Sequence, residues 1–241
     1  MKYKIFAVSD IHGHGSELIR ALDEAGFDPQ DPEHLFVCCG DCFDRGRENR
    51  KVMSYISGLP RKVLVRGNHE DLLENALDRY YVDFIDCHNG TDVTIREFFG
   101  KNAIDENGFI YKDLFIEPKL LAFTGSMVDY FETENYIFTH GWLPVFNEDD
   151  IAERRWENSS ERMWKSARFT EWYKAYRDGL TVPGKIIVCG HRSARYGRMF
   201  DETRKDDDYG IFYGDGVIVL DATTVQSGRI NVLVVEDELI E

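Results

Sequence analysis

Side chains that can bind metal ions or transfer protons recur in five short, glycine-containing stretches of the chain. The stretches are residues 10–13 (DIHG), 40–46 (GDCFDRG), 66–70 (RGNHE), 140–141 (HG) and 190–191 (GH). Their carboxylate, amide and imidazole groups suit Mn²⁺, Fe, Zn²⁺ or Ni²⁺ and require no thiolate ligand. Side chains this short can reach one point only if the backbones approach closely, which the adjacent glycines permit. The pattern therefore indicates a metal site assembled from several loops.

Each of these residues also has a structural explanation when it is taken alone. Asp10 and Asp41 could cap helices, and Asn68 could occupy a turn. A single histidine such as His140 or His191 is more often a hydrogen-bonded structural residue than a ligand. The metal interpretation rests on the five stretches together, because five separate loops that end in Asp, Asn or His rarely arise by accident.

The stretches follow short apolar segments that are typical of buried strands. These segments are residues 3–8, 35–39, 62–65, 136–139 and 185–189. Helices are predicted at 16–25, 48–56 and 70–80, so strands and helices alternate in the first part of the chain. This alternation implies βαβ units and a parallel sheet covered on both faces. Because ligands of such sheets bind beyond the carboxyl ends of the strands, the five stretches are expected to converge.

The remaining segments are less regular. Residues 83–125 are predicted to be mostly helical, and residues 151–178 form a helical, tryptophan-rich stretch. In the tail, turn signals at 214–216 and 227–228 separate β-rich runs, which predicts antiparallel hairpins. A core of two sheets with helices outside accommodates both ends of the chain.

Length and charge limit what the chain can be. Its 241 residues suit a single domain, which we expect to span residues 1–241 with helical inserts at about 83–125 and 147–180. The formal net charge of −15 repels polyanions and argues against duplex nucleic acid as a partner. The apolar part of the N-terminal segment is too short for a signal peptide, and no apolar run is long enough to span a membrane.

The five cysteines predict no role in the chemistry. Their number is odd, and Cys38 and Cys39 are adjacent in an apolar run, which is typical of buried reduced thiols. Cys39 and Cys42 form a C-x-x-C, but no second pair lies at the spacing of a zinc ribbon. We therefore expect a cytoplasmic protein with no membrane partner, in which the thiols neither bind zinc nor act in redox chemistry.

Taken in order, D-x-H-G, G-D-x-x-D-R-G, G-N-H-E, H-G and G-H resemble the motifs of the calcineurin-like metallophosphoesterase superfamily. The similarity is greatest to its phosphoprotein phosphatase branch, with small bacterial and phage Ser/Thr phosphatase-like members, and it extends over residues 10–191. Ser9 departs from the glycine that is common in the family, at a position that is not a ligand. The resemblance implies a four-layer α/β/β/α sandwich of two mixed β-sheets flanked by helices. It also implies a binuclear metal centre in which Mn²⁺ is expected first, and Fe, Zn²⁺ or Ni²⁺ next.

The resemblance further implies a role for each metal-capable residue. The expected metal ligands are Asp10, His12, Asp41, Asn68, His140 and His191. Asp10 and His12 would hold the first ion, Asn68 and the two later histidines the second, and Asp41 would bridge both. Two divalent ions lower the pKa of a shared water from ~15.7 towards ~7, so a metal-bridging hydroxide would be the nucleophile.

Three neighbouring residues would assist the reaction in the family's pattern. Arg45 would bind phosphate through its planar guanidinium. His69 would protonate the leaving oxygen, and Asp44 would orient His69 and keep it protonated. A local surface ion pair is the alternative explanation for Asp44 and Arg45.

The segment 151–178 allows two interpretations. Tryptophans recur in it at eight-residue spacing, roughly on one helical face, as Trp156, Trp164 and Trp172. With seven basic and five acidic residues, the segment could be a packed helix with solvated charges or a wall over the site. The stretch from Trp164 to Arg168 is faintly similar to a family stretch that supplies a second phosphate arginine. Arg168 is therefore the second residue expected to bind substrate.

Three functions fit the sequence. The first is a phosphomonoesterase of Ser/Thr protein phosphatase type, acting on phosphoproteins or small phosphate esters. The second is a dinucleoside polyphosphate hydrolase acting on nucleotides. Related bacterial enzymes of that kind generally lack the acidic residue at Asp44 and follow G-N-H with Asp, so Asp44 and Glu70 favour the first. The third is an inactive phosphate- or phosphopeptide-binding module, which the intact motifs argue against.

Overall fold

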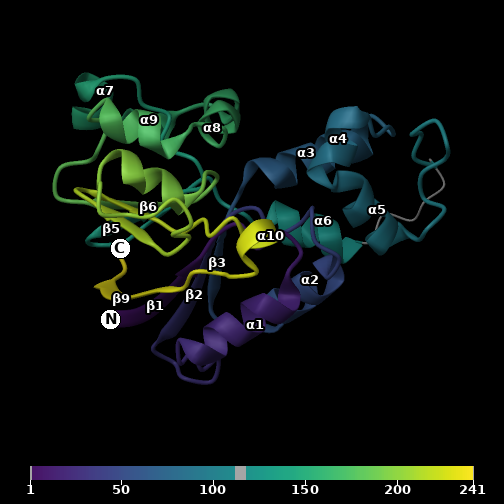
Figure 1. Ribbon diagram of the computed structural model, residues 1–241, viewed down its shortest axis with the longest axis horizontal. Helices are drawn as coiled ribbons and strands as arrows, with labels where there is room; N and C mark the ends of the chain where they lie inside the picture. Colours follow the sequence, from purple (N-terminus) through teal and green to yellow (C-terminus); the bar gives the residue numbers. More distant parts are fainter. Residues whose placement is uncertain (1, 112–117, 241) are drawn as a thin grey trace.

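The computed structural model describes residues 2–111 and 118–240 and contains two mixed β-sheets with helices outside them (Figure 1). In strand order, the first sheet consists of β3 (Lys62–Val65), β2 (His34–Cys39), β1 (Lys2–Val8) and β9 (Leu233–Glu238). The second consists of β4 (Phe131–Glu132), β5 (Tyr136–Phe138), β6 (Ile186–Cys189), β8 (Val217–Val219) and β7 (Phe212–Gly214). Strands β1, β2 and β3 are parallel, as are β5, β6 and β8, whereas β9, β4 and β7 are antiparallel to their neighbours.

Two groups of helices cover the outer faces of the sheets. The first group lies beside the first sheet and comprises α1 (Gly15–Glu24), α2 (Asn49–Gly58), α3 (Asn68–Asp78), α4 (Phe84–Asn89), α5 (Thr91–Phe99) and α6 (Pro118–Gly125). The second lies over the second sheet and comprises α7 (Glu148–Ala152), η1 (Arg155–Asn158), α8 (Glu161–Ala167), α9 (Trp172–Arg177) and η2 (Ala194–Met199). A short helix, α10 (Thr224–Ser227), precedes β9.

Strand β1 shows how the sequence builds these layers. Successive side chains of a strand point to opposite faces of its sheet. Phe6 and Val8 pack against the helices of the first group, whereas Ile5 and Ala7 pack between the two sheets. Phe138 of β5 belongs to the same inner core, so the sheets face each other across it. The order of layers is α/β/β/α, which confirms the expected fold class.

The tail differs from the expected pair of hairpins. Strands β7 and β8 form the hairpin predicted at 214–216. Strand β8 also pairs in parallel with β6, because all three of its residues are buried and it needs a neighbour on each side. The second turn signal, at 227–228, ends α10, and β9 then pairs with β1 in the other sheet. The expectation of a second hairpin was therefore wrong, since an apolar run identifies a strand but not its partner.

The two irregular segments are helical where the structure describes them. Residues 83–125 contain α4, α5 and α6, while 112–117 lie outside the described residues. The tryptophan-rich segment is not one helix, because its three tryptophans lie on η1, α8 and α9. All three are buried in the core beneath these helices, which supports the packed interpretation. The division into one domain with two inserts stays a prediction.

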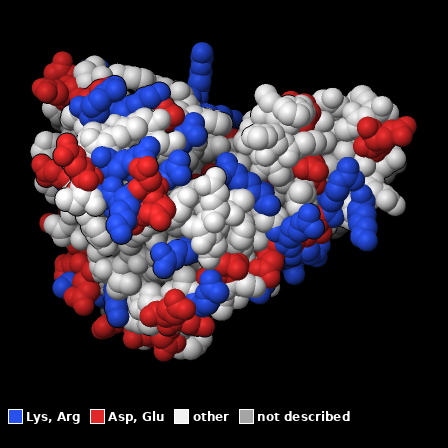
Figure 2. All heavy atoms as spheres, viewed as in Figure 1, with Lys and Arg blue, Asp and Glu red and all other residues white. Residues whose placement is uncertain are grey.

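The distribution of surface charge and the length of the helices limit which partners the protein can bind. On the face seen in Figure 2, groups of Lys and Arg separate groups of Asp and Glu. The net charge of −15 is therefore not gathered into a single field on that face. Among the described helices, none has the length and apolar character that crossing a membrane requires.

Candidate active site and metal centre

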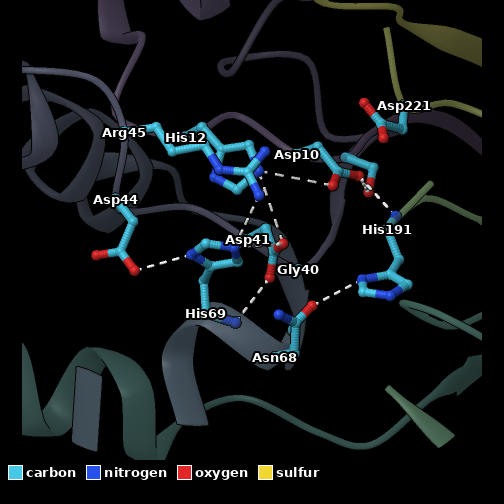
Figure 3. A network of polar contacts seen from close by, with 12 residues as sticks. Asp10, His12, Gly40, Asp41, Asp44, Arg45, Asn68, His69, His191 and Asp221 are labelled. Atoms are coloured by element: carbon cyan, nitrogen blue, oxygen red, sulfur yellow. Dashed lines mark hydrogen bonds and ion pairs between the residues drawn. The ribbon is translucent and has the colours of Figure 1, made fainter. Parts of the chain in front are cut away.

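The loops that follow the strands bring the expected ligands together. Figure 3 shows Asp10, His12, Asp41, Asn68 and His191, and His140 lies against Asn68 and Asp41. Asp10 follows β1, Asp41 follows β2, Asn68 begins α3, His140 follows β5 and His191 follows β6. Their convergence results from the parallel strands, whose carboxyl ends lie at the same edge. All of them except the partly exposed His191 are buried.

Asp10, His12 and Asp41 form the first group of candidate ligands. The Nε2 atom of His12 lies 3.8 Å from Asp10 Oδ1 and 3.7 Å from Asp41 Oδ2. The other ring nitrogen, Nδ1, donates its proton to the carbonyl oxygen of Phe43 at 3.0 Å. This bond turns the lone pair of Nε2 towards the two carboxylates, which is how metal-binding histidines are commonly held.

The second group shares Asp41 with the first. The Nε2 atom of His140 lies 3.3 Å from Asp41 Oδ1 and 2.9 Å from Asn68 Oδ1. His191 Nδ1 lies 2.8 Å from the same amide oxygen, and the buried Nε2 of His191 has no hydrogen-bond partner among the described residues. His140 donates its Nδ1 proton to the carbonyl oxygen of Cys39 at 2.7 Å, so its Nε2 also faces the oxygens as an acceptor when the ring is neutral.

These candidate ligand atoms are better suited to binding cations than to hydrogen bonding with one another. Imidazole lone pairs, carboxylate oxygens and an amide oxygen are all acceptors, so a positive charge is needed among them. Two sets of three candidate ligand atoms lie within 4.8 Å of one another, namely His12, Asp41 and His69, and Asp41, His140 and His191. Asp41 belongs to both sets, which is the position that a bridging carboxylate would occupy.

Without a bound cation, a proton supplies the positive charge. Burial alone would lower the pKa of His140, but the charges of Asp41 and Asp10 outweigh it and raise that pKa to about 10. Burial, and then the charge of His140, lower the pKa of His191 to about 3. Burial would raise the pKa of Asp41, but the facing His140 and His69 hold it well below its usual value. Metal binding at this site must therefore displace a proton from His140.

The backbone of the site is strained. Nine of the described non-glycine residues have a positive φ, and six of them belong to the site, namely Asp10, His12, Asp41, Asp44, Arg45 and His191. Each such residue costs about 1–3 kcal/mol and keeps this conformation only where its surroundings impose it. The concentration of strain here is typical of a functional site.

Glu70 holds two of the strained loops together. Its buried carboxylate accepts hydrogen bonds from the amides of Asp41 at 3.0 Å, Cys42 at 2.8 Å and Gly67 at 2.9 Å. A Cβ atom on Gly67 would collide with the Asp41 carboxylate, so only glycine fits where these loops meet. Sequence reasoning used Glu70 only to compare functions and missed this role, although Glu three residues after a helix-initiating position is a known start signal.

His69 and Asp44 form a buried pair beside the candidate ligands. His69 Nδ1 lies 2.8 Å from Asp44 Oδ2, and its Nε2 lies 3.2 Å from Arg45 Nη2. Burial would lower the pKa of His69, but Asp41 and the hydrogen-bonded Asp44 outweigh it and raise that pKa. Arg45 can only donate, so in this arrangement it donates to Nε2 of His69, and Nδ1 carries the proton shared with Asp44. Nε2 is the ring nitrogen that His69 presents to the rest of the site.

Comparison with known proteins agrees with this geometry. A family model described as calcineurin-like phosphoesterase matches residues 3–220. The chain belongs to this family. A segment is 36% identical over 89 residues to Serine/threonine-protein phosphatase PP1-delta of Caenorhabditis elegans, covering 35% of this chain and 27% of that protein. Another is 37% identical over 67 residues to the symmetrical bis(5'-nucleosyl)-tetraphosphatase of Methylococcus capsulatus, covering 27% and 23%.

The similarity to solved structures concerns the fold alone. The crystal structure of a candidate diadenosine tetraphosphatase superposes on 99% of this chain and 95% of its own, with a TM-score of 0.59 at 15% identity. The curated relatives are matched over 27% and 23% of their lengths, so the segments alone do not transfer a substrate.

Arg168 of this calcineurin-like phosphoesterase is engaged in a buried ion-pair network. It is 4% exposed, and its Nη1 lies 2.6 Å from Asp71 Oδ2 on α3. Its Nη2 pairs with Asp129. The guanidinium thereby ties the end of α8 to the helix that carries Asn68 and His69. The structure does not present Arg168 as a free cation, and its contact with phosphate stays a prediction.

Asp221 is a residue of the site that sequence reasoning missed. It follows the end of β8, and its buried carboxylate lies next to Asp10 (Figure 3). Burial, and then the charge of Asp10, raise the pKa of Asp221 well above its usual value. The signal was present, because Asp221 follows an apolar run just as Asp10 and Asp41 do. The sequence predicts the hairpin of this run but not its parallel pairing with β6, which brings the end of β8 to the site.

Proposed function

We propose that this protein is a binuclear-metal-dependent phosphoesterase that hydrolyses phosphate monoesters in the manner of Ser/Thr protein phosphatases. The supporting observation is that Asp41 lies in both sets of candidate ligands while the Asp44–His69 pair adjoins it. One of these sets contains His69 and not Asp10. Because Nδ1 of His69 is engaged by Asp44, this proposal gives His69 the role of proton donor and gives Asp10 its place as a ligand. Membership in the calcineurin-like phosphoesterase family supports the same class of reaction.

In this proposal the ligands divide between two ions around Asp41. One ion would be held by Asp10, His12 and Asp41, and the other by Asp41, Asn68, His140 and His191. When bound, the pair of ions supplies a hydroxide nucleophile at neutral pH and neutralises charge on the phosphoryl oxygens. Mn²⁺ is proposed first, and Fe, Zn²⁺ or Ni²⁺ also suit a set of oxygen and imidazole donors without thiolate.

The neighbouring residues bind the phosphoryl group and move the proton. Arg45 is exposed at the site, where its guanidinium can make paired hydrogen bonds to phosphate oxygens. His69, oriented through Nδ1 by Asp44, gives its Nε2 proton to the leaving oxygen. The hydrogen-bonded carboxylate of Asp44 favours the protonated form that this step needs.

The His69–Asp44 pair favours esters of alcohols as substrates. The alkoxide released from phosphoserine or phosphothreonine is a poor leaving group and gains most from a proton donor. The similarity of one segment to a Ser/Thr phosphatase agrees with this choice. The similarity of another to a bis(5'-nucleosyl)-tetraphosphatase makes dinucleoside polyphosphate hydrolysis the second candidate. An inactive binding module would have no use for a buried, oriented proton donor.

The state of the cysteines supports the proposal that the protein works in a reducing compartment and that no thiol takes part in turnover. All five are unpaired, and every one except Cys87 is buried. We therefore place the enzyme in the cytoplasm, with a phosphorylated protein, small ester or nucleotide as its substrate.

The test is a comparison of metals and substrates. Metal-free protein is reloaded separately with Mn²⁺, Zn²⁺ and Fe and assayed on a phosphoserine peptide, an aryl monoester, an aryl diester and a dinucleoside tetraphosphate. We expect metal-dependent turnover that is greatest on the two monoesters. Turnover confined to the tetraphosphate would favour the second candidate, and binding of phosphate without turnover under any metal would favour the inactive module.

A further inference from the structure

Helix α5 belongs to a segment without family motifs, yet it contacts the catalytic pair directly. Thr91 Oγ1 donates a hydrogen bond to Asp44 Oδ2 at 2.8 Å, and Thr94 Oγ1 donates one to Asp44 Oδ1 at 2.6 Å. The amide of Asp44 in turn donates to Thr94 Oγ1 at 3.0 Å. Both threonines and Asp44 are 0% exposed. Each carboxylate oxygen of Asp44 therefore has a hydroxyl donor, in addition to the bond that Oδ2 makes with His69.

The same helix fixes the backbone that carries Asp44. Thr91, Thr94 and Glu97 follow at three-residue spacing, so they lie along one face of α5. Glu97 Oε2 accepts hydrogen bonds from the backbone N of Asn49 at 3.0 Å and from its Nδ2 at 2.8 Å. Asn49 Oδ1 accepts one from the amide of Asp44 at 3.1 Å. One helix thus holds both the side chain and the main chain of Asp44.

The close approach of α5 to this turn requires a glycine. Gly90, which precedes α5, has a φ of 86°, and a Cβ atom there would collide with the backbone nitrogen of Arg45. Asp44 and Arg45 themselves have φ values of 73° and 62°, a conformation that persists only when neighbours impose it. The contacts from α5 are among those neighbours.

We propose that Thr94 and Thr91 are positioning residues that fix the Asp44 carboxylate so that His69 points its Nε2 proton at the leaving oxygen. This inference rests on the proposed role of His69 as proton donor. A buried carboxylate that lacks its donors is costly and reorients to find others. The two hydroxyls prevent that rotation, and small errors in the placement of a reacting group cost rate steeply. The segment without motifs is therefore part of the catalytic apparatus.

The test removes one hydroxyl and keeps the side-chain shape. Thr94→Val deletes the donor to Asp44, whereas Thr94→Ser retains it. Thr133→Val is the matched control, because Thr133 is also 0% exposed and also donates a 2.6 Å hydrogen bond to a carboxylate, that of Asp237, outside the site. Thr91→Val provides a second variant should Thr94→Val fail to fold. All proteins are assayed metal-loaded, with metal content and Tm measured in parallel.

We expect Thr94→Val to lower kcat on a phosphoserine peptide by roughly tenfold to a hundredfold, the loss typical when an outer partner of an active-site group is removed. On nitrophenyl phosphate, whose leaving group hardly needs a proton, the loss stays within a few-fold. KM and metal content stay close to wild type, and Thr94→Ser restores most of kcat. Thr133→Val lowers Tm without this dependence on the leaving group. In a His69→Asn background, Thr94→Val adds little further loss, because its effect passes through His69.

Two results separate failure of this inference from failure of the proposed function. If His69→Asn slows the peptide far more than nitrophenyl phosphate while Thr94→Val and Thr91→Val do not, the inference about α5 is wrong and the proton-donor role stands. If His69→Asn slows both substrates equally, the proton-donor role is wrong, and the inference falls with it.

Discussion

The site has two parts whose polar atoms are satisfied in different ways. Around Asp41, the ring nitrogens of His140 and His191 face carboxylate and amide oxygens, and the buried Nε2 of His191 has no partner among the described residues. Around Asp44, every contact joins a donor to an acceptor, from His69, Thr91 and Thr94. The first part needs a positive charge between its imidazoles and oxygens, either an extra proton or a cation, whereas the hydroxyl and imidazole donors of the polypeptide satisfy the second.

Because of this difference, we expect variants of the two parts to have different effects on metal content and on the rates with different substrates. A change around Asp41 should alter metal content, and every substrate should then slow together. A change around Asp44 should leave the metals in place and slow substrates according to how much their leaving groups need a proton. Elemental analysis and two substrates therefore distinguish the parts.

The largest effect is expected for Asp41→Asn. Its loss of turnover should exceed the ~10²–10⁴-fold typical of removing a general acid or base, because both sets of candidate ligands lose their shared carboxylate. Metal content, measured by elemental analysis, should fall by at least one ion per chain. Full metal content in Asp41→Asn would contradict the assignment of Asp41 as a bridging ligand, and with it the distinction between the two parts of the site.

His69→Asn and His140→Asn test the division between the parts. His69→Asn should keep its metals and lose ~10²–10⁴-fold on a phosphoserine peptide but far less on nitrophenyl phosphate. His140→Asn should lose metal and slow both substrates alike. His34→Asn, at a buried histidine outside the site, is the control for loss of a structural imidazole. Metal loss in His69→Asn would move His69 into the ligand set.

Removal of the metals should lower stability. A ligand that binds only the folded state at a hundred times its Kd stabilises by ~2.7 kcal/mol. We expect Tm to fall in chelator and to recover on addition of Mn²⁺, rising with the logarithm of its concentration once this exceeds Kd. An unchanged Tm would mean that the facing acceptors need no cation.

The metal-free protein should also lose stability as the pH rises. The pKa of His140 is raised in the folded protein from 6.5 to about 10. Its proton therefore contributes stability that is fully present below about pH 6.5 and disappears as the pH approaches 10. Tm of the metal-free protein should fall across this range, and the metal-loaded protein should not share this contribution, because the cation has replaced the proton. If Tm changed with pH in the same way in the metal-free and the metal-loaded protein, His140 would carry no such proton.

The smallest effect is expected at the cysteines. Alkylation, or Cys39→Ala combined with Cys42→Ala, should leave turnover within a few-fold of wild type. Burial raises the pKa of Cys39 well above its usual value, and the contact with the Cys38 thiol, followed by burial, does the same for Cys42. Neither thiol is therefore a nucleophile at neutral pH. A collapse of activity with the fold retained, monitored by circular dichroism, would bring a thiol into the mechanism.

The sequence predicted those parts of the fold and site that depend on local pattern. Asp10 and Asp41 were found because each follows an apolar run that is recognisable as a parallel strand. Asp221 was missed because the pairing of β8 with β6 joins residues far apart in the chain, and no local pattern records it. Recognising a strand is a local matter, whereas choosing its partner is a property of the whole core.

Side-chain contacts between distant segments were equally invisible. Thr94 donates a hydrogen bond to Asp44, which lies fifty positions earlier in the chain. Nothing in the sequence around a helical threonine identifies such a distant partner. Arg168 was expected to face phosphate, but the burial and the carboxylates of Asp71 and Asp129 around it arise only from tertiary packing. Motifs therefore located the metal-capable residues more readily than the residues that hold them.

The pairing of β9 with β1 has a consequence for the order of folding. The two strands are matched along their length, with Ile5 opposite Val235. During synthesis, β1, β2 and β3 emerge long before β9, so the free edge of β1 has no partner until residues 233–238 have been made. An open edge of this kind is a template for pairing with other chains. Slow translation of the residues between β3 and β9 should therefore favour aggregation of the nascent protein, and chaperones that shield apolar strands should relieve it.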